Sequence, residues 1–332
     1  MEYTNFFGGD DLRPLIWIID EEWSEYQTEE MILKDAFPDC EIRHSGNNYQ
    51  EDLESFGKHA DAILCQVYIN LPGETIRQLT NCKIIAIYGG GYDRVDIEAA
   101  KAQNIAVTFV PGYCVEDVSD YAISAIYFFN KNLAFYFSAA NKGPWGAQAA
   151  HQLNHRIQES TLFIIGFGRI GKTVAQKAKL MRMNVLVYDP NLGEEEEQGY
   201  GVKKVSLDEG LSAADFVTIH VKYDEHTESL ISMKEFQKMK ETAYVINTSR
   251  GNVIKEEDLI EAVQKKVIAG AMLDVISNEP PEGHEEIFTI PGIFVTPHVS
   301  YLSAESLLTL KQRASSNVVK LLQGKNSEDT VY

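Results

Sequence analysis

Short apolar runs alternate with longer polar segments in the N-terminal third of the chain. The apolar runs are bounded by Gly, Pro or charged residues and read PLIWIID, DAILC, KIIAIY and IAVTF. Between them lie polar segments with helical periodicity, such as EEWSEYQTEEMILKDAF and RVDIEAAKAQN. Fully apolar strands separated by amphipathic helices are typical of a mostly parallel sheet that is covered by helices on both faces.

A second series of the same kind begins near Thr161. Its predicted strands are TLFIIG, NVLVYD, ADFVTIHV, AYVINTS, VIAGAMLDV and GIFVTPH. Helices are predicted to start near Arg169, Met233, Lys255 and Tyr301. The pattern therefore predicts two α/β units in tandem, and the final helix is positioned to return to the first unit.

Two segments between these series need separate interpretation. The apolar stretch Tyr121–Ala140 contains Asn130, Lys131 and Asn132 near its middle, where a bilayer would disfavour them most, so we interpret it as one long buried helix. The acidic run Glu194–Glu197 is interpreted as a solvated loop.

Composition narrows the function. A chain of 332 residues is too long for one simple core and fits two domains. Its net charge of −19 disfavours nucleic acid and anionic membranes as partners. The four cysteines have no C-x-x-C spacing and no clustered His, so neither a disulfide framework nor a metal site is expected. The segment MEYTNFFGGDDLRP has no secretory pattern, and a cytoplasmic location is expected.

The strongest local motif is GFGRIG, which spans Gly166–Gly171. A predicted strand precedes it, a predicted helix follows, and Asp189 ends the next strand about twenty residues on. Gly166 permits the tight turn, Gly168 allows close approach of a pyrophosphate, and Gly171 allows the helix to pack on the strand. Asp189 would accept the ribose 2′-hydroxyl and repel a 2′-phosphate, so the predicted cofactor is NAD and not NADP.

Three chemically useful residues follow later strands. Arg250 lies in NTSRG, Glu279 in SNEPP and His298 in TPHVS. The carboxyl ends of strands in a doubly wound sheet converge on the ligand crevice. Taken singly, each has an ordinary explanation: a surface ion pair, a solvated acid or a loop histidine. Together, after a dinucleotide motif, they form a candidate reaction centre.

These motifs resemble those of the D-isomer-specific 2-hydroxyacid dehydrogenases. The similar stretches are GFGRIG, INTSRGNVIKEEDLIEAV, IAGAMLDVISNEPP and VTPH, together with YGGGYDRVDIEAAKAQNIAVTFVPGYCVEDVSDYA at residues 88–122. Within the family, HVSYLSAESLLTL looks closest to the branch of the C-terminal-binding-protein corepressors and their bacterial relatives. The resemblance implies two Rossmann- or flavodoxin-like domains with the cofactor and active site in the cleft between them. It implies a substrate domain of residues 1–112 plus 300–332 and an NAD-binding domain of residues 113–299.

The resemblance also implies roles for the reaction centre. Arg250 would hold the substrate carboxylate with its planar fork. His298 would give a proton to the keto oxygen, and Glu279 would orient the imidazole and favour its charged form. The backbone N–H groups of Gly90 and Gly91 would bind the same carboxylate, and Tyr301 would form an apolar wall.

Further cofactor contacts follow from the same resemblance. Besides the three glycines and Asp189, the expected contacts come from Arg169, Ile170, His220, Val221, Thr248 and Asp274. For Asp274, a plain capping role after a strand is the alternative.

The substrate is expected to be small and unphosphorylated. Gln66 falls where many family members have Arg, and no Lys or Arg occurs between Asp61 and Ile76. The main functional hypothesis is that the protein is an NAD-dependent D-2-hydroxyacid dehydrogenase that acts on a small 2-keto or 2-hydroxy acid. The alternatives are a D-3-phosphoglycerate dehydrogenase and an NAD(H)-sensing, corepressor-like binding protein.

The apolar segment from Tyr121 and the Trp145 loop also lead us to expect a homodimer.

Overall fold

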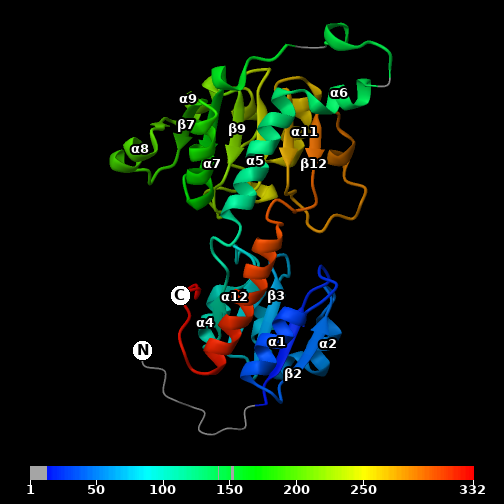
Figure 1. Ribbon diagram of the computed structural model, residues 1–332. Helices are drawn as coiled ribbons and strands as arrows, with labels where there is room; N and C mark the ends of the chain where they lie inside the picture. Colours follow the sequence, from blue (N-terminus) through cyan, green and yellow to red (C-terminus); the bar gives the residue numbers. More distant parts are fainter. Residues whose placement is uncertain (1–12, 141, 151–152) are drawn as a thin grey trace. The chain divides into compact units, whose positions relative to one another are not determined.

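The computed structural model describes residues 13–140, 142–150 and 153–332 (Figure 1). Residues 1–12, which make up most of the N-terminal segment MEYTNFFGGDDLRP, lie outside this description. The chain divides into two compact units, of which the first combines the residues up to Tyr113 with Ser303–Tyr332 and the second is Cys114–Leu302. The chain therefore passes between the units twice.

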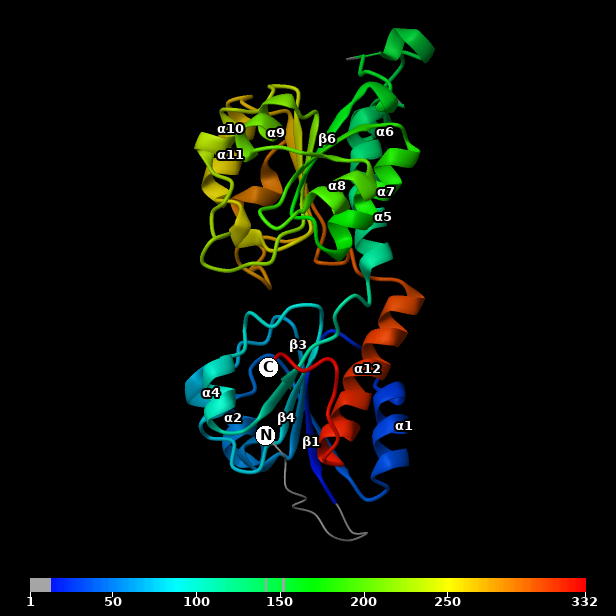
Figure 2. The ribbon, with the colours of Figure 1, turned by 90° about the vertical axis from the view of Figure 1, so that its left-hand side faces the viewer.

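The first unit holds a five-stranded parallel sheet in the order β2-β1-β3-β4-β5. The strands are β1 Leu15–Ile19, β2 Glu41–Ser45, β3 Ala62–Gln66, β4 Ile84–Tyr88 and β5 Ala106–Thr108. One face is covered by α1 Gln27–Ala36 and α12 Ala304–Leu322, which pack against each other (Figure 2). The other face carries α2 Gln50–Ser55, α3 Gly73–Ile76 and α4 Ile97–Ala102. The last helix thus returns to the first unit.

The second unit holds a seven-stranded parallel sheet in the order β12-β11-β10-β9-β6-β7-β8. Its strands are β6 Thr161–Ile165, β7 Asn184–Tyr188, β8 Lys203–Lys204, β9 Phe216–Ile219, β10 Tyr244–Asn247, β11 Gly270–Leu273 and β12 Ile293–Val295. Helices α5 Val115–Asn130 and α7 Arg169–Leu180 cover one face, and α9 Leu207–Ala213, α10 Met233–Phe236 and α11 Glu256–Gln264 cover the other (Figure 2). The predicted α/β class with two parallel sheets is confirmed.

The strand order reverses between β6 and β9. The chain leaves β6 toward β7 on one side and later returns to add β9 on the other side. Such a switch point leaves a crevice at the carboxyl ends of the two strands, and nucleotides bind there in doubly wound sheets. The motif GFGRIG directly follows β6, so the topology places it at this crevice.

Two strands have no counterpart among the apolar runs, namely β2 and β8. Both are edge strands. In β2 only Ser45 is buried, and both residues of β8 are exposed. An edge strand that is solvated on most of its positions has no continuous apolar run, so hydrophobic pattern alone does not reveal it.

The prediction of one long buried helix over Tyr121–Ala140 is wrong for its second half. Helix α5 ends at Asn130, and Asn132 has a left-handed backbone with φ of +48°. A separate helix, α6 Leu133–Ala139, follows and has no buried residue. Within the described residues, no helix is long and apolar enough to cross a membrane.

The prediction of a loop at Glu194–Glu197 is also wrong. These four glutamates form the first turn of α8 Glu194–Tyr200. The N–H groups at a helix N-terminus carry partial positive charge, so acidic side chains in the first turn stabilise the helix. Four adjacent like charges suggested a solvated loop, although acidic residues are favourable at a helix N-terminus.

Candidate active site

The glycine motif forms a turn that larger residues could not make. Gly166 has φ of +94°, and a Cβ there would lie 2.7 Å from the backbone carbonyl of His220. A Cβ on Gly171 would lie 2.2 Å from the carbonyl oxygen of Gly166. By contrast, none of the described residues has an atom within 4 Å of the position a Cβ would take on Gly168, which caps the N-terminus of α7. An open backbone at a helix N-terminus between β6 and β9 fits the pyrophosphate of a dinucleotide.

Asp189 is held beside this turn. One carboxylate oxygen accepts the N–H of Phe167 at 2.7 Å, and the other accepts the N–H of Asn191 at 2.8 Å. The acid at the end of β7 is therefore fixed against the glycine loop, where a ribose hydroxyl of a dinucleotide would be recognised.

The structure places a cation, Lys204, near Asp189, which the sequence did not predict. The ammonium of Lys204 on edge strand β8 donates to the carbonyl oxygens of Leu192 at 2.6 Å and Pro190 at 3.3 Å. The segment from Pro190 to Glu197 contains no cation of its own, but the sheet pairing brings one to it. Because β8 has no apolar signal, nothing in the sequence pointed to this contact.

His220 and Thr248 lie together at the neighbouring strand ends. The imidazole Nε2 is 2.9 Å from the Thr218 hydroxyl, and Nδ1 is 3.3 Å from the Thr248 hydroxyl. Burial lowers the pKa of His220 to about 3. The ring is therefore neutral at physiological pH and links the ends of β9 and β10. Val221 follows it and packs against the core on the α9–α11 face.

Glu279 and His298 form a direct pair. His298 Nδ1 lies 2.9 Å from Glu279 Oε2, and the other carboxylate oxygen accepts the N–H of Ile276 at 2.9 Å. Burial by itself would raise the pKa of Glu279, but the hydrogen bond and charge of His298, the Ile276 N–H and the charge of Arg250 together lower it. The imidazole keeps a 27% exposed side chain, so its second nitrogen can face a reactant.

The backbone around His298 is organised by Asp274. This side chain is 1% exposed, and its two oxygens accept the N–H groups of Val299 and Ser300, each at 2.8 Å. The Asp274 carbonyl accepts the N–H of His298 at 3.0 Å. His298 itself has φ of +52°, an uncommon conformation for a non-glycine residue, which persists only where the surroundings impose it.

Arg250 follows β10 in a loop that packs tightly on the Glu279 loop. The Asn247 side chain holds the start of this loop. Its amide N–H donates to the Arg250 carbonyl at 2.9 Å, and its oxygen accepts the Ser249 N–H at 3.0 Å. A Cβ on Gly251 would lie 2.0 Å from the backbone carbonyl of Ile276. The two loops are therefore in backbone contact, which keeps Arg250 near Glu279.

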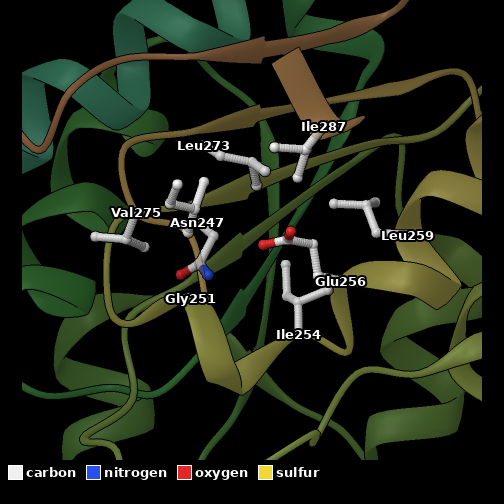
Figure 3. A pocket seen from close by; sticks show the side chains of 9 residues that line it. Asn247, Gly251, Ile254, Glu256, Leu259, Leu273, Val275 and Ile287 are labelled. Atoms are coloured by element: carbon white, nitrogen blue, oxygen red, sulfur yellow. The ribbon is translucent and has the colours of Figure 1, made fainter. Parts of the chain in front are cut away.

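A small pocket lies beneath these loops. Its lining includes Asn247, Gly251, Ile276 and the carboxylate of Glu256 (Figure 3). Glu256 accepts the N–H of Ser277 at 3.0 Å and also the Ser277 hydroxyl. The pocket is thus part of the support for the loop that carries Glu279, and apolar core residues complete it.

The remaining predicted site residues are placed as follows. Tyr301 lies edge-on to His298 with the ring centroids 6.3 Å apart. Arg169 and Ile170 begin α7, next to the open Gly168. Gly90 and Gly91 belong to the first unit and begin two residues after the end of β4. The second unit alone therefore brings together Arg250, Glu279, His298 and Tyr301.

Arg94 of the first unit lies near the segment that follows β3. Arg94 Nη1 donates to the carbonyl oxygen of Tyr68 at 3.2 Å. Tyr68 lies in the segment after β3, which has no cation of its own. The fold thus brings a guanidinium to that segment, although the sequence places it 26 residues away.

A dinucleotide turn at the switch point, with an acid–imidazole pair and an arginine at later strand ends, defines a nicotinamide-dependent oxidoreductase. Comparison with known proteins specifies the family. Residues 123–300 match the D-isomer specific 2-hydroxyacid dehydrogenase, NAD binding domain. The chain therefore belongs to the D-isomer-specific 2-hydroxyacid dehydrogenases, which are NAD-dependent and act on the CH–OH group of 2-hydroxy acids.

Individual relatives agree with this assignment. A putative 2-hydroxyacid dehydrogenase of Staphylococcus epidermidis is 33% identical over 88% of this chain and 92% of its own length. A glyoxylate reductase of Korarchaeum cryptofilum is 31% identical over 80% of this chain and 81% of its own. The structure of D-lactate dehydrogenase from Aquifex aeolicus, complexed with NAD and lactic acid, has the same fold, with a TM-score of 0.83 at 24% identity over 96% and 98% of the two chains.

Proposed function

We propose that this protein reduces a small, unphosphorylated 2-keto acid with NADH and catalyses the reverse oxidation of the D-2-hydroxy acid. The observation that carries the proposal is the 2.9 Å pair of Glu279 and His298, placed at strand ends of the unit that contains the glycine turn. A carboxylate beside an imidazole is suited to hold and release one proton near neutral pH.

In this proposal each residue of the chain has a defined task. Bound NADH supplies the hydride. Arg250 pairs with the substrate carboxylate, and the backbone N–H groups of Gly90 and Gly91 bind the same group. His298 gives its proton to the keto oxygen as the negative charge develops there. Glu279 orients the imidazole and stabilises its protonated form.

The domain roles follow the same scheme. Residues 1–112 with 300–332 would bind the substrate, and residues 113–299 would bind NAD. Gly166, Gly168 and Gly171 would bind the pyrophosphate together with Arg169 and Ile170. Asp189 would bind the ribose. Further cofactor contacts would come from His220, Val221, Thr248 and Asp274.

The substrate side chain is the least constrained part of the proposal. Tyr301 offers an aromatic wall beside His298, which favours alkyl or thioether groups through burial of apolar surface, at about 0.8 kcal/mol per CH₂. Gln66 is 2% exposed and carries no charge. By contrast, Arg94 reaches the segment after β3 and would favour a substrate with an anionic side chain, such as 3-phosphohydroxypyruvate.

The test is a substrate panel with NADH at fixed pH and salt. We expect the highest kcat/KM of the panel with one of four unphosphorylated acids: glyoxylate, pyruvate, 2-ketobutyrate or 4-methylthio-2-oxobutyrate. A clear preference for 3-phosphohydroxypyruvate would instead identify a D-3-phosphoglycerate dehydrogenase. Tight NADH binding with slow turnover of every acid would favour the NAD(H)-sensing alternative, and with it the corepressor-like branch.

We also propose that the protein is a cytoplasmic homodimer. Large apolar side chains are exposed on and after α6, with Phe137 at 74%, Trp145 at 80% and Leu153 at 87%. Apolar residues at such density usually mark an interface. Light scattering on the purified protein should give twice the chain mass of 37.3 kDa. Phe137→Asp with Trp145→Asp should then give the monomer mass.

A further inference from the structure

A chain of hydroxyl groups connects helix α5 to the His298 loop. The Tyr121 hydroxyl lies 2.6 Å from the Thr296 hydroxyl. The Thr296 hydroxyl in turn donates to Oδ1 of Asp274, also at 2.6 Å. None of these contacts involves a residue that binds substrate through its side chain in the proposed reaction.

The direction of the hydrogen bonds is fixed by chemistry. An ionised carboxylate can only accept, so Thr296 must give its single proton to Asp274. Thr296 can then only accept from Tyr121, and Tyr121 is the donor at the start of the chain. Burial raises the pKa of Tyr121 to about 12, so the phenol keeps the proton that it donates.

The end of the chain bears directly on His298. The Asp274 oxygen that receives the Thr296 proton also accepts the Val299 N–H, and the second oxygen accepts the Ser300 N–H. Val299 and Ser300 directly follow His298, whose φ of +52° requires support from its surroundings. Asp274 is buried, so water does not replace a partner that it loses.

Packing holds the start of the chain in place. Phe128 on α5 packs edge-on against Phe294 on β12, with ring centroids 4.8 Å apart. Tyr121 lies two turns earlier on the same helix and is packed against the same core. In addition, α5 begins where the chain enters the second unit, and the His298 loop ends where the chain leaves it. The hydroxyl chain therefore ties these two segments together.

We propose that Tyr121 is a positioning residue for the reaction, which acts through Thr296 and Asp274 on the backbone that carries His298. The role in catalysis rests on the proposed function, whereas the effect on the loop does not. Tyr121 is not a catalytic residue, because within the described part of the chain its hydroxyl hydrogen-bonds only to Thr296. Without its donation, the Thr296 hydroxyl loses one of its two partners and holds Asp274 less firmly.

The first measurement is amide hydrogen exchange, which requires no substrate. In Tyr121→Phe and Thr296→Val, we expect faster exchange at residues 298–300 than in the wild type. Thr296→Ser keeps the hydroxyl and should restore protection. Tyr127→Phe is the matched control, because Tyr127 lies on the same helix with a 36% exposed side chain. Unchanged exchange in both Tyr121→Phe and Thr296→Val would overturn the proposal.

The second measurement is kinetics with the best acid of the panel. Loss of one hydrogen bond that acts through the loop should lower kcat about 3- to 10-fold in Tyr121→Phe, while the Kd for NADH stays the same. Adding Tyr121→Phe to Thr296→Val should cause no further loss, because both act through one chain. Additive losses, or a Tyr121→Phe enzyme with wild-type kcat, would contradict the positioning role. If the wild type reduces no acid at all, the proposed function fails, and the exchange data alone decide whether Tyr121 supports the loop.

Discussion

Glu279 meets His298 with one oxygen and the backbone N–H of Ile276 with the other. The carboxylate is therefore anchored to its own loop and cannot rotate away from the imidazole without losing a hydrogen bond. Its lowered pKa means that it stays ionised down to pH values below its ordinary range. The carboxylate therefore remains negatively charged beside the imidazole across neutral pH.

Glu279→Gln should move the pH dependence of keto-acid reduction. The amide still accepts a hydrogen bond but no longer stabilises a positive imidazole, so the fall in kcat/KM with rising pH should begin at lower pH. His298→Ala should lose at least about 10²-fold in rate, the scale for removal of a general acid. Glu282→Gln is the control, because it changes an exposed carboxylate three residues after Glu279. An identical pH profile in Glu279→Gln would remove this carboxylate from the mechanism.

Arg250→Lys should impair catalysis although it conserves the charge. An ammonium cannot form the planar, two-bond pairing of a guanidinium with a carboxylate. We expect a higher KM for the keto acid and a lower kcat/KM, with NADH binding by fluorescence little changed. A collapse of NADH binding would instead place Arg250 at the cofactor.

Asp189→Asn should reduce the preference for NADH over NADPH. The wild-type carboxylate repels a 2′-phosphate, whereas the amide keeps one of the two hydrogen bonds to the loop through its carbonyl oxygen and leaves the Lys204 ammonium nearby. Removing one close charge should improve relative kcat/KM for NADPH about tenfold or more. Glu194→Gln, in the exposed first turn of α8, controls for the general acidity of this region. Wild-type efficiency with NADPH equal to that with NADH would contradict the prediction at the outset.

His220 should make folding stability fall on acidification. Its folded pKa of about 3 is below the unfolded value of 6.5, so below about pH 6.5 the unfolded chain binds a proton that the folded protein does not. Between pH 7 and 5.5, His220→Gln should lose about 1 kcal/mol less of its unfolding free energy than the wild type does. Urea titrations at the two pH values measure this. His226→Gln, with an 84% exposed side chain, should behave like the wild type.

Gly251→Ala should damage the reaction centre without touching any catalytic side chain. The added Cβ would lie 2.0 Å from the Ile276 backbone, so the loop that carries Glu279 must shift. We expect a lower kcat and a changed pH profile. Gly199→Ala on α8 is the control, because the added Cβ would meet no atom of the described residues within 4 Å. A fully active Gly251→Ala enzyme would show that the contact between the two loops is not needed.

The sequence by itself determined the fold class and indicated the candidate residues of the second unit. Continuous apolar runs identify central parallel strands, because those strands are buried on both faces. The positions of the candidate residues Asp189, Arg250 and His298 at strand ends could be anticipated, because parallel strands bring their carboxyl ends to one edge of the sheet. Glycine spacing in GFGRIG was informative for a related reason, since backbone atoms fill the space that a side chain would need.

Tertiary structure alone decided the features that depend on side chains meeting across the chain. The solvated edge strand β8 carries Lys204 to the Asp189 loop, and the fold brings Arg94 to Tyr68. The break at Asn132 and the exposed α6 reflect a left-handed residue that hydrophobic periodicity does not register. Tyr121, Thr296 and Asp274 are separated by up to 175 residues, and their hydrogen bonds form only once α5 packs beside β12. Local pattern reports burial and turn chemistry, whereas the direction of a hydrogen bond between distant residues exists only in the packed chain.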